Sequence, residues 1–334
     1  PQMVMWDPAT YPNVETLADL GSEGVTISVF GGGVFAEVFI AQGIWDAGQV
    51  DPSYDGSPAN FIANGGSIAQ QGFASAEPYD YETVFEDWGK PVKFQLLHDA
   101  GFKVYSQTIA IRSAEKAELD SCLKAFVPVV QRAVVSFIED PATANNIIID
   151  AVDTFGSFWV YSQGLAEFSV QSQLDLGLVG NGPNGTVGDM VEARIQGVIT
   201  TMADAGIDTG GITPADVYTN EYIDTSIGFD TGDLSACPDP IVIQTDWFPE
   251  SEHGAMYELF GSGDYSIDSD NLIVSGTLHD GGTDTGIGLE VRTGGPAIGF
   301  SPVASYMYTD DSITFGYANT EAQVTFFESA PLLS

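Results

Sequence analysis

The chain has few basic residues: nine lysines and arginines stand against 47 aspartates and glutamates, so the formal net charge is −38 over 334 residues. A field of this sign repels phosphate backbones and anionic lipid head groups, which argues against nucleic acid and membrane surfaces as partners. The acidic residues are dispersed among apolar ones, so we expect a folded acidic surface and no disordered acidic tail. Halophilic adaptation is the origin we expect, because salt screens the self-repulsion.

Long apolar runs and cysteine motifs are also missing. No run approaches the length of a membrane span, and no signal peptide is evident, since the segment from Pro1 has the pattern of a strand. The two cysteines, Cys122 and Cys237, have no cysteine or histidine at metal-ligand spacing, so we expect no metal site. An exported protein could join them in a disulfide, and the sequence leaves bonded and free thiols equally open.

Signatures of catalysis are absent as well. The three histidines, His98, His253 and His279, accompany no nucleophile elbow, no paired metal-binding histidine and no cysteine triad spacing. We therefore expect a protein that is not an enzyme and needs no cofactor.

What is present is a two-domain length of chain with 44% hydrophobic residues, enough for a sizeable core. Strand and helix patterns alternate, which predicts the α/β class. The central stretch is the apolar run Ile241–Gln244, which is followed by Asp246 and Trp247 and then by an apolar helix, Met256–Phe260. In an open α/β sheet, ligands bind at the carboxyl ends of such strands.

Other segments have clear patterns. Gly24–Phe30 predicts a strand, Gly31–Gly33 a turn and Val34–Ile40 a helix, an arrangement in which backbone N–H groups can face a ligand. Trp159 and Tyr161 are expected in the core. Further strands are predicted at 92–97 and 102–111, and further helices after Ser113, with a kink at Pro128, and at 145–168 and 188–206.

The stretch Asp246-Trp247-Phe248-Pro249, followed by His253 and an apolar helix, resembles the opening strand of the substrate-binding proteins of ABC importers, in the branch that takes thiamine pyrimidine precursors. Relatives in that group bind aliphatic sulfonates or nitrate. Further matches run through nearly all of the chain in a rotated order, and they are Phe315–Glu321, Gly31–Gly33, Ala69–Pro78 and Pro214–Ile223. The resemblance implies a two-lobed type II periplasmic-binding-protein fold, circularly permuted, with a ligand cleft between the lobes. We favour an engineered origin for the permutation.

The rotated order implies a division of the chain. We expect residues 1–15 to hold part of lobe 1 and the crossover, 16–103 to form lobe 2, and 104–228 to hold the return crossover and helices mainly of lobe 1. Residues 229–240 would join the natural termini, and 241–334 would be the natural N-terminal part of lobe 1. The family usually carries a short strand between the helix near Leu332 and the equivalent of Pro1, and the sequence indicates none here.

The resemblance also implies a set of ligand-binding residues. Trp247 and Tyr317 would stack on a planar ring, while Asp246 and Glu77 would accept hydrogen bonds from an aminopyrimidine or neutralise an amine. Pro78 is expected to hold Glu77 in an extended conformation. His253, Asn319, Thr320 and the amides of Gly32 and Gly33 complete the expected site.

The expected function is extracytoplasmic capture of a small planar molecule for an ABC permease, by a periplasmic or cell-surface monomer whose leader is absent from this chain. A sulfonate or nitrate binder on the same fold is one alternative. A pyrimidine-synthesising enzyme relative is another, because that enzyme shares Thr219–Tyr222. Its cysteine-rich run is replaced here by Val104–Ile109.

Overall fold

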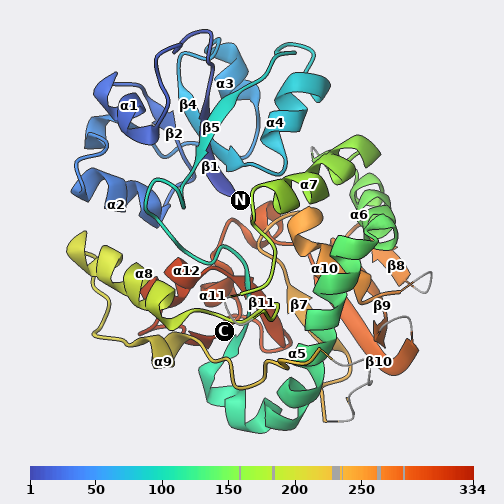
Figure 1. The fold of residues 1–334 in the computed structure, drawn as a ribbon. Coiled ribbons are helices and arrows are strands. Elements are labelled where there is room, and N and C mark those ends of the chain that lie inside the picture. The colour runs from blue at the N-terminus through green and yellow to red at the C-terminus, as the bar shows by residue number, and fades with distance from the viewer. Residues whose placement is uncertain (158, 183–184, 228–233, 235, 262–264, 281–282) are drawn as a thin grey trace.

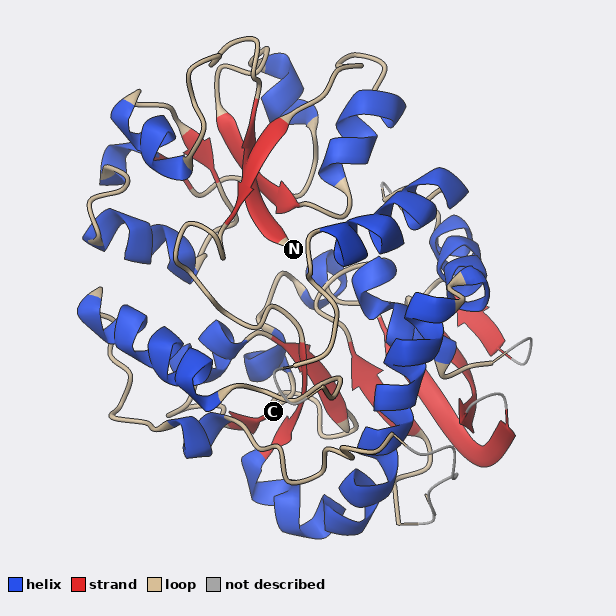
Figure 2. Ribbon diagram, in the orientation of Figure 1, coloured by secondary structure: helices blue, strands red, loops and turns tan. Residues whose placement is uncertain are grey.

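The structure is a computed structural model that describes residues 1–157, 159–182, 185–227, 234, 236–261, 265–280 and 283–334. These residues form a mixed α/β structure with two sheets, and helices pack around both (Figure 1, Figure 2). We call the five-stranded sheet, drawn in blue and cyan in Figure 1, sheet A, and the seven-stranded sheet, drawn mainly in orange and red, sheet B.

In sheet A, β2 is parallel to both of its neighbours, whereas β1 runs antiparallel between β4 and β5. The order across the sheet is β3 (Val50–Asp51), β2 (Ile27–Ser28), β4 (Ala69–Phe73), β1 (Gln2–Trp6) and β5 (Lys93–Leu96). The helices of this part are α1 (Leu17–Ser22), α2 (Val34–Ala41), α3 (Ala59–Ala63) and α4 (Glu77–Tyr79). The predicted strand after Pro1 and the predicted helix from Val34 are thus confirmed.

Sheet B repeats this plan. Its strand β7 is parallel to β10 and β11, and β6 runs antiparallel between β11 and β12. The order is β12 (Leu332–Leu333), β6 (Thr108–Arg112), β11 (Phe315–Ala318), β7 (Ile241–Gln244), β10 (Thr283–Arg292), β9 (Ile273–Asp280) and β8 (Tyr265–Asp268). The five strands β10-β7-β11-β6-β12 therefore match β3-β2-β4-β1-β5 in order and in direction.

The predicted central strand, β7, is buried along its whole length. Ile241 and Ile243 belong to a core that β7 shares with helix α5 (Lys116–Glu139), whereas Val242 belongs to a second core around helix α11 (Val303–Tyr306). An unbroken apolar run suits this position, since a parallel strand covered on both faces gains from apolar side chains on each. The position of β7 places the residues that follow it at one end of sheet B.

Most helices surround sheet B. Figure 1 shows α5 and α10 side by side, and α8 and α12 together on the opposite side of the sheet. They are α5 (Lys116–Glu139), α6 (Ala142–Phe155), α7 (Gln163–Asp175), α8 (Glu192–Asp204), α9 (Pro214–Val217), α10 (Gly254–Glu258), α11 (Val303–Tyr306) and α12 (Thr320–Thr325).

The expectation that no segment has the length and apolarity of a membrane span was wrong for the segment that contains helix α5. The helical segment Ser113–Glu139 passes that test by length and composition, and 44% of its most apolar window is buried. Core helices pass the same test. Here the helix carries Arg132, whose guanidinium forms a two-point ion pair with buried Asp280, and Cys122 is disulfide-bonded to Cys237. The helix is therefore built into the folded body, and of the two thiol states left open by the sequence the structure has the bonded one.

The expected division of the chain needs two corrections. Residues Pro1–Trp6, assigned to lobe 1, lie as β1 inside sheet A, so 1–15 belong with 16–103. The strand that the sequence did not indicate is present as β12, which pairs with β6 at the edge of sheet B. A strand of two residues carries too little pattern to predict, and the choice of partner strand depends on distant segments. Of the expected junction, 229–240, residues 229–233 and 235 lie outside the described residues.

Three local expectations are also corrected. The helix predicted over 145–168 is interrupted, because Gly156 ends α6 in a left-handed conformation and the Ser162 hydroxyl caps α7. The strand predicted over 102–111 begins only at Thr108. Glu77 is not extended but opens α4, since proline is tolerated in the first turn of a helix.

Candidate functional site between the two sheets

The turn after β7 fixes the direction of Trp247. The hydroxyl of Thr245 donates to the Trp247 carbonyl over 2.8 Å, and the Gly295 N–H donates to the Asp246 carbonyl over 2.9 Å. A side chain at Gly294 would meet the Thr245 carbonyl at 2.2 Å, so the neighbouring turn needs glycine there. The backbone before Trp247 is thus held by its neighbours, and the half-buried indole faces sheet A.

Aromatic residues from both parts of the chain gather around this indole. The ring centroid of Trp247 lies 5.5 Å from that of Phe30, 6.0 Å from Phe300 and 6.3 Å from Trp159. Phe30 follows β2 of sheet A and also packs on Tyr54 at 4.5 Å. We call these five residues the aromatic cluster. Edge-on and tilted pairs at such distances are favourable for aromatic rings, so the cluster holds the two parts together.

Carboxyl groups gather beside the aromatic cluster. The Ser75 hydroxyl, which follows β4 of sheet A, donates a hydrogen bond to Glu252 Oε1 across the two parts of the chain. The Phe73 N–H donates to Glu77 Oε2 over 2.7 Å. Glu250 is 2% exposed, and its Oε1 has no hydrogen-bond partner among the described residues. We call Glu77, Glu250 and Glu252 the carboxyl cluster.

Burial dominates the electrostatics of the carboxyl cluster. It raises the pKa of Glu77 to about 8, and the Phe73 and Glu77 backbone N–H groups only partly oppose it. Burial, followed by repulsion from Glu252, raises the pKa of Glu250 well above its usual range. The pKa of Glu252 is raised by burial as well. Desolvated carboxyl groups that repel one another bind a proton or a cation readily.

His253 links the turn after β7 to strand β11. Its Nε2 lies 2.8 Å from Asp246 Oδ1, and its ring packs edge-on against the Tyr317 ring with centroids 5.2 Å apart. The histidine is fully buried. One carboxylate oxygen of Asp246 is therefore paired with His253, and the Tyr317 ring on β11 is held by its contact with the same histidine.

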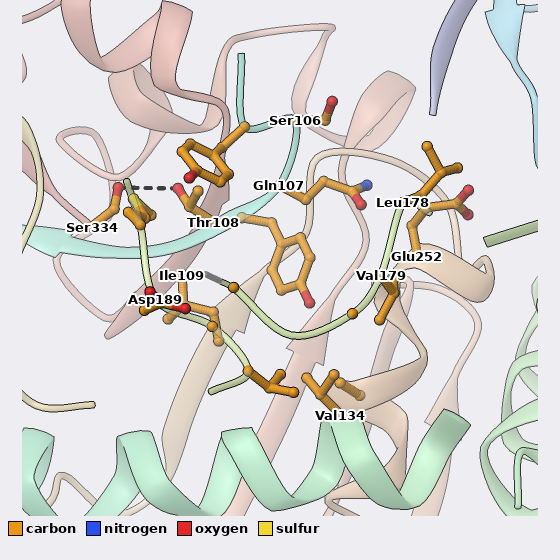
Figure 3. Close-up of a pocket in the computed structure, with 18 of the residues that line it drawn as sticks. Ser106, Gln107, Thr108, Ile109, Val134, Leu178, Val179, Asp189, Glu252 and Ser334 are labelled. Carbon is orange, nitrogen blue, oxygen red and sulfur yellow. Dashed lines mark hydrogen bonds between the residues drawn. The ribbon is translucent and has the colours of Figure 1, made fainter. Parts of the chain in front are cut away.

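A cavity of about 950 Å³ opens beside Tyr317 and Glu252. Figure 3 shows Ser106–Ile109 along one wall, Glu252 and Leu178 on another, Asp189 opposite and Val134 of α5 below. Pro1 and Ser334 also line it, so β1 begins and β12 ends at the same cavity. Its volume is in the range of small-molecule sites.

The structure brings together only part of the predicted site. Asp246, Trp247 and His253 lie in the turn after β7, Glu77 lies in the carboxyl cluster, and Tyr317 lines the cavity. Of these five residues, Tyr317 lines the cavity, whereas Asp246, Trp247, His253 and Glu77 do not.

The other predicted residues have structural partners. The Asn319 side chain caps α12 by accepting from the Ala322 N–H over 2.6 Å, and the Thr320 hydroxyl accepts from the Tyr105 N–H over 3.2 Å. The Gly33 N–H donates to the Phe30 carbonyl, which closes the turn, while Gly32 has a left-handed backbone. None of these four residues lines the cavity.

Sequence reasoning missed several residues of this region. Glu250 and Glu252 stand in the same stretch as Asp246, but an acidic chain offers no local reason to select them. Tyr161 is buried as expected, whereas Trp159 is half-buried and stacks on Phe248 beside the aromatic cluster. The pattern gave no signal for Phe300, which is 51% exposed and has a left-handed backbone.

The described residues contain no group of three or more histidine, cysteine or acidic side chains placed to hold a metal ion. Comparison with protein-family models, with curated proteins and with solved structures found no match to the chain.

Proposed function

We propose that the chain is a solute-binding protein with the type II periplasmic-binding-protein fold in circularly permuted order. The observation that carries the proposal is the repetition of one strand order, with one antiparallel strand in fourth place, in two sheets that enclose a site between them. Ligands of such two-lobed proteins are captured between the lobes, and closure is favoured by the differential affinity of the ligand for the closed form.

The permutation is part of the proposal. In the rotated order, β7 would open the natural chain and β12 would lead directly into β1. The end of β12 and the beginning of β1 line the same cavity, which supports this connection. A fold tolerates such a rearrangement when the original termini are exposed and close together.

The proposed ligand is a small planar molecule, a thiamine pyrimidine precursor in the first instance. Trp247 and Tyr317 offer ring faces or edges for stacking, and the neighbouring carboxyl groups can accept hydrogen bonds from ring amino groups. The acids and the scarcity of basic residues disfavour the sulfonate and nitrate alternative.

We propose capture without turnover, as a monomer outside the cytoplasm, with delivery to an ABC permease. The disulfide between Cys122 and Cys237 supports an oxidising compartment. A ligand recovered chemically changed after incubation with the protein would favour the enzyme alternative.

The test is a thermal-shift screen in high salt against pyrimidine precursors, thiamine, riboflavin, taurine and nitrate, followed by titration of any compound that raises the melting temperature. Substituting Trp247→Ala should weaken binding of a pyrimidine by about tenfold or more, because one stacked ring contributes about 1–3 kcal/mol. Tyr308→Ala, an exposed aromatic outside the aromatic cluster, is the matched control. Unchanged affinity in Trp247→Ala would remove the indole from the site.

A further inference from the structure

The cavity has a long apolar side that the proposed pyrimidine does not need. Helix α5 turns one face toward it, and the spacing of three and four residues brings those side chains into line. Val127, Val130, Val134 and Ile138 each remain only partly buried. Exposed apolar surface inside a cavity is costly unless a ligand covers it. Because this face lines a cavity, less than half of the most apolar stretch of the helix is buried.

A second wall of the cavity, which we call the roof, is formed by the segment after α7. Its residues Leu178 and Val179 line the cavity, and Figure 3 shows both on the same side as Glu252. The Gln131 side chain of α5 donates to the Val187 carbonyl over 2.8 Å and to the Asp224 carbonyl over 3.2 Å. The roof is therefore fastened to α5, so the apolar space has fixed walls.

One end of this space is acidic. Glu252 lines the cavity, and Glu250 lies behind it with one oxygen unpaired. The hydroxyl of Tyr257, which is fully buried near Glu250, also has no hydrogen-bond partner among the described residues. Buried polar groups normally have hydrogen-bond partners, and unpaired ones indicate a missing partner. A carboxyl group at one end of the cavity and an apolar wall along α5 describe one kind of ligand.

We propose that the cavity binds an organic ammonium ion, whose charged head contacts Glu252 and whose apolar body lies along α5. This inference rests on the proposed solute-binding function and narrows its ligand class. The ammonium group supplies hydrogen-bond donors to the acidic end, and the apolar body covers the exposed face of α5. A charge-assisted hydrogen bond in a desolvated place is stronger than its neutral counterpart.

Protons should leave when the ammonium ion binds. Burial raises the pKa of Glu252 and of Glu250, so both acids take up protons more readily than free carboxyl groups do. A cation stabilises the charged forms of these acids and favours release of their protons, so the affinity should rise as the pH rises. The titratable and charged groups that face the two acids are Glu77, Asp246, His253, Tyr161, Tyr257, Tyr317, the Pro1 amino group, whose pKa is lowered by burial, and Arg194, which acts on that amino group.

The test compares two probes that differ only in their head group, the cation 4-phenylbutylamine and the neutral 4-phenylbutan-1-ol. Calorimetric titration of the whole chain at fixed high salt should show the amine binding about tenfold or more tightly than the alcohol. Repeating the titration in buffers of different ionisation enthalpy should reveal proton release with the amine. Equal affinities for the two probes, or no binding of the amine, would overturn the proposal.

Two substitutions test separately the contact with the charged head of the ligand and the contact with its apolar body. Glu252→Gln should abolish the preference for the amine, whereas Glu118→Gln on the exposed face of α5 removes the same charge and should preserve it. Val134→Trp should fill the apolar space and weaken the binding of both probes. If Glu252→Gln does not fold, the preference for the amine can be measured in Glu250→Gln and, as a function of pH, in the wild type. Pyrimidine binding through Trp247 without amine binding would contradict this inference and leave the proposed function intact.

Discussion

Glu77 makes the stability of the protein depend on pH in a direction opposite to that of most carboxyl groups. The substitution Glu77→Gln removes its charge and keeps its shape, since the amide oxygen can still accept from the Phe73 N–H. Space is tight here, because a side chain at Gly72 would lie 2.8 Å from the Glu77 carboxyl carbon. The substitution therefore tests charge without opening a cavity.

The sign follows from the two protonation states. Burial raises the pKa of Glu77 from its ordinary value of 4.5 to about 8, so the folded chain keeps a proton that the unfolded chain has released. The stabilising contribution of that proton is complete below about pH 4.5 and is lost as the pH rises to about 8. The loss is about 3 kcal/mol by pH 7 and at most about 5 kcal/mol above pH 8, as an order of magnitude.

Urea unfolding followed by circular dichroism, at fixed high salt and between about pH 5 and about pH 8, measures this difference. As the pH rises, the free energy of unfolding of Glu77→Gln should increase relative to that of the wild type. Glu82→Gln, an exposed acid in the neighbouring turn, should follow the wild type. Parallel curves for wild type and Glu77→Gln would refute the raised pKa of this group.

Two further predictions concern the whole fold. Cys122→Ser should lower the free energy of unfolding by about 4–5 kcal/mol, because the disulfide closes a loop with a sequence separation of 115. Reduction of the wild type should cause a similar loss in the same urea titration, and an unchanged midpoint would contradict it. The net charge of −38 predicts a melting temperature that rises as KCl is increased from about 0.1 M to about 1 M. A flat response would argue against halophilic adaptation.

The sequence predicted well where local pattern and burial agree. Ile241–Gln244 forms a central strand, and Val34–Ala41 forms a helix after the glycine turn. Each of these segments has apolar spacing that only one secondary structure can bury. Predictions failed where one residue decides, as at Gly156, which divides two helices, and Glu77, which opens a helix before a proline.

The candidate site was predictable in part for the same reason. The end of a central strand is a defined place, so Asp246 and Trp247 could be expected there, whereas Tyr317, inside β11, was expected only from the family resemblance. Asn319 and Thr320 looked equally suitable as ligand-binding residues, but their side-chain oxygens accept hydrogen bonds from the N–H groups of Ala322 and Tyr105. Local sequence cannot tell a capping oxygen from one that is left for a ligand.

The sequence by itself determined the α/β class, the central strand with its aromatic and acidic end, and the acidic surface, because composition and short-range periodicity control these features. Only the tertiary structure decided that β1 joins sheet A, that Ser75 meets Glu252 over a separation of 177 residues, and that Cys122 meets Cys237. Such encounters depend on how whole sheets and helices pack. Many alternative pairings satisfy the same local patterns, and the packed core selects one of them.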